Sequence, residues 1–278
     1  MAALPTIILV HGFWGGAAHW AKAIVELDRL GHKGMRAVEL PLTSLAGDAA
    51  RTRQIAAQVE GPVLLVGHSY GGAVITEAGT APNVAGLVYI AAFAPDAGES
   101  PGALTQQHPP AGAANLAPDG DGYLWVKPDK FHESFCQDLG ADEALVMAVT
   151  QKAPLASTFG EAISDPAWRV KPSWYQISSE DRMIDPANQK AMSDRLGARK
   201  IITLDAGHAS LASRPAEVAA LIDEAARSLE LTRTAAKGSI ERWPDNIQPS
   251  PNSGPFTCAS TARRRRGRSI MWGPASSC

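Results

Sequence analysis

Apolar and polar residues along most of this chain follow two alternating patterns. Short apolar runs are typical of buried strands, and between most of them lie Ala-rich stretches whose apolar residues recur at helical spacing. The predicted strands are Ile7–Val10, Arg36–Leu40, Val63–Val66, Leu87–Ala91, Trp174–Ser178 and Ile201–Leu204. The predicted helices are Ala18–Leu30, Asp48–Val59, Gly72–Gly79, Pro186–Leu196 and Arg214–Leu229. This alternation predicts an α/β fold, with a mostly parallel sheet covered by helices on both faces.

Two regions interrupt the alternation. Residues 95–172 are rich in Pro and Gly, are too long for a plain loop and contain no strand-like run, so we expect a mostly helical insertion. After residue 232, prolines and the arginine run 263–266 replace the apolar pattern. We therefore expect a domain over residues 1–232 and a disordered basic tail over 233–278. The tail reads as a solvated extension, with a nucleic-acid or localisation patch as the alternative.

Charge and composition narrow the class of protein. The 278 residues carry a net charge of −2, but residues 233–278 hold eight basic and two acidic side chains, which leaves 18 basic and 26 acidic in residues 1–232. Such an acidic body is a poor binder of nucleic acid. No apolar stretch approaches a membrane span, and the N-terminus lacks the basic segment of a signal peptide, so we expect a cytoplasmic protein without a membrane partner. Only Cys136 lies in the body, which excludes a disulfide framework there.

The segment Gly67-His68-Ser69-Tyr70-Gly71 fits the pattern G-x-S-x-G between a predicted strand and a predicted helix. In that context the serine sits on a strained turn, with its hydroxyl above the carboxyl end of the sheet. The glycines leave room for the tight turn. We therefore identify Ser69 as the candidate nucleophile.

A serine hydroxyl needs a base to take its proton, and an acid to orient that base. His208 follows the last predicted strand, at the sheet edge where such folds hold their sites, whereas His68 adjoins Ser69 and should point elsewhere. Three residues after the strand at 174–178 comes Asp181, our candidate acid. The other acids considered are Glu180, Asp185 and Asp205; Asp185 precedes a proline and reads as a helix N-cap.

An oxyanion hole needs two N–H donors. Tyr70, directly after the serine, supplies one. The glycine-rich segment HGFWGG after the first strand is the natural source of the second, with Phe13 as the candidate and Trp14 as the alternative. These donors would lie beside the serine hydroxyl.

At this point the chain resembles the α/β-hydrolase superfamily, and within it the branch of small bacterial carboxylesterases, plant methylesterases and plant hydroxynitrile lyases. The resemblance rests on segments spread over residues 5–230: ILVHGFWGGAAHW, GHSYGGAVI, LVYIAAFAP, EDRMIDP and GHAS. It implies a triad of Ser69, Asp181 and His208, Phe13 and Tyr70 in the oxyanion hole, a helical cap and no cofactor. The lyases carry Thr where this chain has Gly12, and Lys where it has Ala209, which argues for hydrolysis.

The sequence thus predicts a serine carboxylester hydrolase that acts on a small apolar ester through an acyl-enzyme, without cofactor or metal. A lyase or carbon–carbon hydrolase on the same triad is one alternative. A small-molecule receptor with slow turnover is the other.

Overall fold

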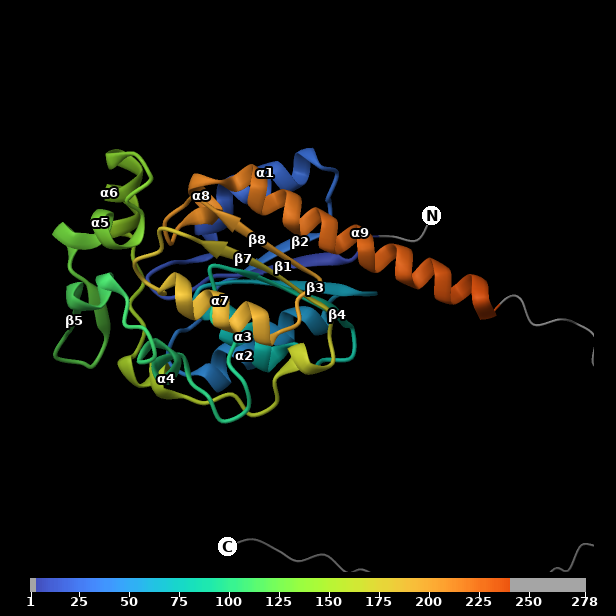
Figure 1. Ribbon diagram of the computed structural model, residues 1–278, viewed down its shortest axis with the longest axis horizontal. Coiled ribbons are helices and arrows are strands. Elements are labelled where there is room, and N and C mark those ends of the chain that lie inside the picture. Colours follow the sequence, from blue (N-terminus) through green and yellow to red (C-terminus); the bar gives the residue numbers. More distant parts are fainter. Residues whose placement is uncertain (1–3, 241–278) are drawn as a thin grey trace, which may run out of the picture.

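A single parallel sheet organises the computed structural model, which describes residues 4–240. Within these residues, six strands pair in the order β2-β1-β3-β4-β7-β8 (Figure 1). Their bounds are β1 Thr6–Val10, β2 Met35–Val38, β3 Val63–His68, β4 Val84–Ile90, β7 Ser173–Ser178 and β8 Lys200–Leu204. Every neighbouring pair is parallel, so the predicted parallel sheet is confirmed.

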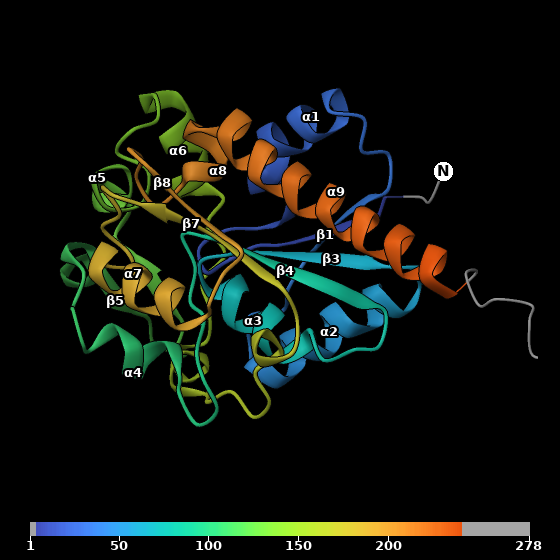
Figure 2. The same cartoon turned by 45° about the vertical axis from the view of Figure 1, so that its right-hand side comes forward.

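Helices cover both faces of the sheet because its central strands are apolar on both sides. Ile7 and Leu9 of β1 face one helical layer, whereas Ile8 and Val10 face the other. On the first face lie α1 (Ala21–Arg29), α8 (Ser210–Ser213) and α9 (Pro215–Ile240); on the second lie α2 (Leu45–Ala57), α3 (Tyr70–Ala78) and α7 (Pro186–Arg195) (Figure 2). A short 3₁₀ helix, Ala17–Trp20, precedes α1.

The insertion between β4 and β7 lies at the end of the sheet where the strands finish (Figure 1). It contains α4 (Pro101–Thr105), α5 (Phe131–Phe135) and α6 (Ala141–Val149). It also contains four 3₁₀ helices: Ala111–Asn115, Pro128–Lys130, Ala156–Gly160 and Ala167–Arg169. Beside these helices, β5 (Leu116–Pro118) and β6 (Leu124–Val126) pair in antiparallel fashion, although the sequence shows no strand-like run there. Strands of three residues are too short to produce a periodic signal.

The last helix extends past its predicted end at Leu229. It continues to Ile240 and so includes residues 233–240, which the sequence analysis assigned to the tail. Good helix formers such as Ala235, Ala236 and Lys237 continue there, and the next proline comes only at Pro244. The rest of the predicted tail, 241–278, lies outside the described residues. Among residues 4–240, no helix combines the length and apolar character needed to cross a bilayer.

Candidate active site

Ser69 occupies the sharp turn between β3 and α3. All six residues of β3 are buried, and the chain then turns through Ser69 at φ 55° and ψ −126°. A positive φ is costly for a residue with a side chain, and such strain concentrates at functional sites. The turn also brings α3 against β1, where a Cβ on Gly71 would lie 2.4 Å from the Val10 carbonyl oxygen. Only glycine fits at that crossing.

The structure brings the three predicted polar residues into one hydrogen-bonded chain. The Ser69 Oγ lies 2.9 Å from His208 Nε2, and His208 Nδ1 lies 2.8 Å from Asp181 Oδ2. All three residues are buried. Because an ionised carboxylate only accepts hydrogen bonds, Nδ1 of His208 carries the proton and Nε2 presents its lone pair to the serine hydroxyl. This arrangement can take a proton from Ser69.

Asp181 is held in place by four hydrogen bonds. Its Oδ1 accepts from the backbone N–H groups of Met183 and Ile184, at 2.7 and 2.9 Å. Its Oδ2 accepts from Gln189 Nε2 at 2.8 Å in addition to His208. Sequence reasoning missed Gln189, whose only signal was a polar residue on the inner face of a predicted helix. A carboxylate with this many donors has little freedom to turn away from the imidazole.

The other acids considered lie apart from His208. Asp185 caps α7, where its Oδ1 accepts from the Ala187 N–H at 2.8 Å, as the Asp-Pro pair predicted. Glu180 and Asp205 are exposed. The structure therefore brings Asp181, and none of these three, to the imidazole.

The insertion contacts both loops that carry the site. Gln137 Nε2 donates to the Glu180 carbonyl at 2.6 Å, and Asp138 Oδ2 accepts from the Gly207 N–H at 2.9 Å. Glu180 and Gly207 directly precede Asp181 and His208 in the chain. One turn of the insertion thus braces the acid loop and the imidazole loop together.

Two further histidines support the site without facing Ser69. His68 Nε2 lies 2.8 Å from the carbonyl oxygen of His208, and burial holds the pKa of His68 well below its usual value. Because a neutral imidazole can donate to that carbonyl oxygen, His68 holds the backbone of His208 in place. His11 Nε2 accepts from the Leu40 N–H at 3.0 Å, and its Nδ1 donates to the Gly12 carbonyl at 2.8 Å. His11 thus shapes the loop after β1.

That loop distinguishes the two candidate oxyanion donors. The Trp14 N–H donates to the Lys152 carbonyl at 3.0 Å, so it is already engaged. In the part of the chain that the structure describes, no hydrogen-bond acceptor occupies the backbone N–H of Phe13 or of Tyr70. Free N–H groups on either side of a serine are what an oxyanion hole requires.

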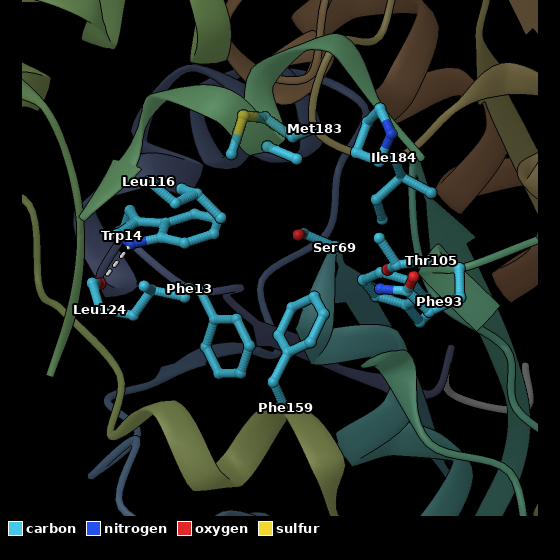
Figure 3. A pocket seen from close by; sticks show the side chains of 13 residues that line it. Phe13, Trp14, Ser69, Phe93, Thr105, Leu116, Leu124, Phe159, Met183 and Ile184 are labelled. Carbon is cyan, nitrogen blue, oxygen red and sulfur yellow. Dashed lines mark hydrogen bonds between the residues drawn. The ribbon is translucent and has the colours of Figure 1, made fainter. Parts of the chain in front are cut away.

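A cavity of about 210 Å³ opens onto Ser69. Aromatic and aliphatic side chains surround the hydroxyl, with Trp14, Phe13 and Leu124 on one side and Phe93 and Ile184 on the other (Figure 3). The remaining lining residues are Thr105, Gln106, Pro110, Ala113, Leu116, Phe159 and Met183. None of the lining residues is charged. A neutral, apolar small molecule fits such a cavity.

Within residues 4–240, no three His, Cys, Asp or Glu side chains converge in a way that could hold a metal ion. The side chains of Ser69, His208, Asp181 and Gln189 are hydrogen-bonded to one another. The chemistry that these side chains can perform is proton transfer and nucleophilic attack.

Known proteins resemble this chain in sequence and in fold. The model of the alpha/beta hydrolase family matches residues 7–221. A carbendazim hydrolyzing esterase from Nocardioides sp. (strain SG-4G) is 32% identical over 110 residues, which cover 35% of this chain and 46% of that protein. The matched stretch thus spans about half the length of that curated relative.

Two solved structures show the same fold. A pyrethroid hydrolase from Sphingobium faniae JZ-2 superposes with a TM-score of 0.68 at 22% identity, covering 81% of this chain and 98% of that one. Polyneuridine aldehyde esterase superposes with a TM-score of 0.70 at 20% identity, covering 80% and 100%. At these identities the likeness shows the fold alone. By the extent of the family match, the chain belongs to the alpha/beta hydrolase family.

Proposed function

We propose that this protein is a serine carboxylester hydrolase for small, neutral, apolar esters. The observation that carries the proposal is the continuous hydrogen-bonded chain from Ser69 through His208 to Asp181. Its Ser69 end opens to an uncharged cavity. Esterases among its relatives support the reaction class. The proposed roles follow from what each atom faces.

The first half of the reaction forms an acyl-enzyme. Ser69 Oγ attacks the ester carbonyl carbon while His208 Nε2 takes the hydroxyl proton. The carbonyl oxygen becomes an oxyanion, which the N–H groups of Phe13 and Tyr70 stabilise. The bond to the alcohol oxygen then breaks, and His208 returns its proton to that oxygen. Asp181 holds the imidazole in the required tautomer and stabilises the imidazolium.

The second half releases the acid. Water enters, His208 Nε2 takes one of its protons, and the resulting hydroxide attacks the acyl carbon. The second tetrahedral intermediate collapses with return of the proton to Ser69 Oγ. The products are one alcohol and one carboxylic acid, and the enzyme is regenerated.

The test combines covalent labelling with turnover. A fluorophosphonate probe should label Ser69 in the wild type, and the protein should hydrolyse short p-nitrophenyl esters. Ser69→Ala should keep its melting temperature and lose both signals, since the hydroxyl has no packing role. If that variant kept a tenth of the wild-type turnover, the covalent route would be wrong.

The same experiment separates the alternatives. Cleavage of a cyanohydrin faster than of any ester would favour a lyase. Tight binding of an apolar ester with negligible turnover would favour a receptor. The identity of Gly12 and Ala209 argues for hydrolysis, because neither residue can supply the hydroxyl or the ammonium group found at these positions in the lyases that the sequence resembles.

A further inference from the structure

Tyr70, whose backbone N–H is a candidate oxyanion donor, has a side chain that lies outside the cavity. The ring is fully buried, and its hydroxyl donates a 2.8 Å hydrogen bond to Oδ2 of Asp48 in the first turn of α2. Tyr70 does not line the cavity. Contact with a substrate therefore does not explain why the Tyr70 hydroxyl is bonded to Asp48.

Asp48 is an acidic residue without any exposed surface. Its Oδ1 accepts from the Leu42 N–H at 2.9 Å, and burial raises the pKa of its carboxyl group although that bond, the Tyr70 hydroxyl and the charge of Lys152 oppose the rise. Burying a carboxyl group lowers stability unless the group is well paired, and an apolar pair of equal volume often stabilises a protein as well. A buried Asp–Tyr pair at this place therefore suggests a role in positioning.

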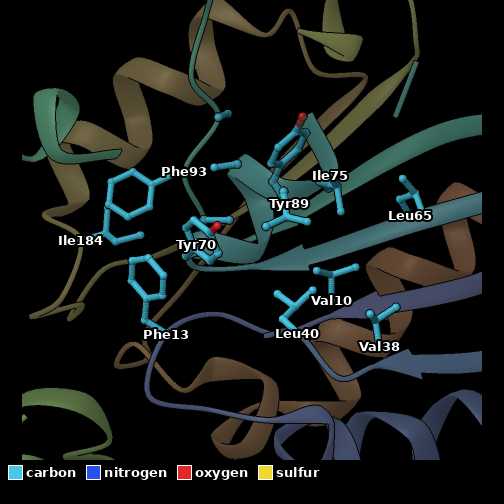
Figure 4. Packing of buried hydrophobic residues seen from close by; sticks show 14 of the residues in the cluster. Val10, Phe13, Val38, Leu40, Leu65, Tyr70, Ile75, Tyr89, Phe93 and Ile184 are labelled. Carbon is cyan, nitrogen blue, oxygen red and sulfur yellow. The ribbon is translucent and has the colours of Figure 1, made fainter. Parts of the chain in front are cut away.

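The ring of Tyr70 contacts Phe13, the residue that supplies the second candidate oxyanion donor. It stacks on the ring of Phe13 with centroids 3.9 Å apart and planes inclined by 15°. Figure 4 shows the two rings side by side, one from the start of α3 and the other from the loop after β1. The two residues that supply the candidate oxyanion donors thus touch each other through their side chains.

We infer that the Asp48–Tyr70–Phe13 stack is a positioning device that sets the spacing of the two oxyanion donors. Asp48 anchors the Tyr70 hydroxyl from α2, the Tyr70 ring supports the Phe13 ring, and the backbone of each follows its ring. The inference rests on the proposed function. It assigns to Asp48 and to the Tyr70 hydroxyl an effect on the transition state that is transmitted through other groups.

The test removes one hydroxyl. Tyr70→Phe keeps the stacked ring and deletes the hydrogen bond to Asp48. We expect kcat for p-nitrophenyl butyrate to fall about tenfold with KM changed less than about twofold, because the oxyanion forms during the reaction and is not yet present in the bound ester. The inhibition constant of an aryl trifluoromethyl ketone, whose adduct with Ser69 carries an oxyanion, should rise by a similar factor.

A matched control exists in the same core. Tyr89 on β4 is also fully buried, and its hydroxyl lies 2.9 Å from Thr76 Oγ1, away from the cavity. Tyr89→Phe should lower the melting temperature about as much as Tyr70→Phe, yet leave kcat and the inhibition constant within about twofold of the wild type. Equal kinetics in the two variants would overturn the inference.

If Tyr70→Phe does not fold, a second variant tests the same hydrogen bond from the Asp48 side. Asp48→Asn preserves the side-chain volume and weakens the same anchor, so it should shift kcat and the inhibition constant together. The double variant should lose no more activity than the more impaired single variant, because both changes break one interaction. Multiplicative losses would overturn the inference. A wild type that neither labels with fluorophosphonate nor hydrolyses esters would instead refute the proposed function.

Discussion

Gly12 lies beside the serine, and replacing it with alanine should impair the enzyme severely. A Cβ at this position would lie 2.5 Å from Ser69 Cβ and 3.0 Å from both Ser69 Oγ and the His68 carbonyl oxygen. Ordinary contact begins at 3.4 Å, so the two groups must separate by about 0.9 Å. If Ser69 takes the whole shift directly away from His208, its hydrogen bond lengthens from 2.9 Å to at most about 3.8 Å, which is beyond bonding range.

We therefore expect Gly12→Ala to lower kcat/KM for a p-nitrophenyl ester about 100-fold, since a misplacement of about 1 Å costs that much. Labelling of Ser69 by fluorophosphonate should slow in parallel. Gly160→Ala is the matched control, because no heavy atom lies within 4 Å of its added Cβ. The control should match the wild type in both assays. If Gly12→Ala kept half of the wild-type kcat/KM, the crowding argument would be refuted.

Three further outcomes follow from the geometry. Asp181→Asn should keep the fold and lower kcat by about three to four orders of magnitude, because the imidazole loses its correct tautomer; normal turnover would contradict the assignment. Asp185→Ala should cost about 1 kcal/mol of unfolding free energy, measured with urea, with kcat unchanged. Burial lowers the pKa of His19 from 6.5 to about 4, so between these values the unfolded state binds the proton and the folded state does not. Stability should therefore fall as the pH falls from about 6.5 to 4, and His19→Gln should reduce that loss by about 3 kcal/mol at most.

Features that depend on a local pattern could be predicted from the sequence. The strands of the sheet are apolar runs bounded by turns, and each was located to within a few residues. Ser69 carried its own signal, because a glycine-flanked serine between a strand and a helix is typical of a nucleophile on a sharp turn. Asp185 carried one too, since the Asp-Pro pair marks a helix start.

Features that depend on contacts between distant segments could not be predicted from the sequence. Asp48 reads as an ordinary acidic residue in the first turn of a helix, and nothing in its neighbours indicates the Tyr70 hydroxyl 22 positions later. Gln189 likewise gains its role only when α7 packs against the loop of Asp181. Strand order needs the pairing of residues that are far apart in the chain, so periodicity alone could not give it.

The turn at Gln137 and Asp138, which braces the loops of Asp181 and His208, affects how proteins with this fold can diverge. Leu116, Leu124 and Phe159 reach the cavity from the insertion, and their side chains make no hydrogen bond to Ser69, His208 or Asp181. Gln137 and Asp138 bind the residues just before Asp181 and His208. Related proteins can therefore change these three cavity-lining side chains to accept new molecules while Ser69, His208 and Asp181 stay in place, provided that this turn and the Leu124 and Lys152 carbonyls that hold Trp14 are kept.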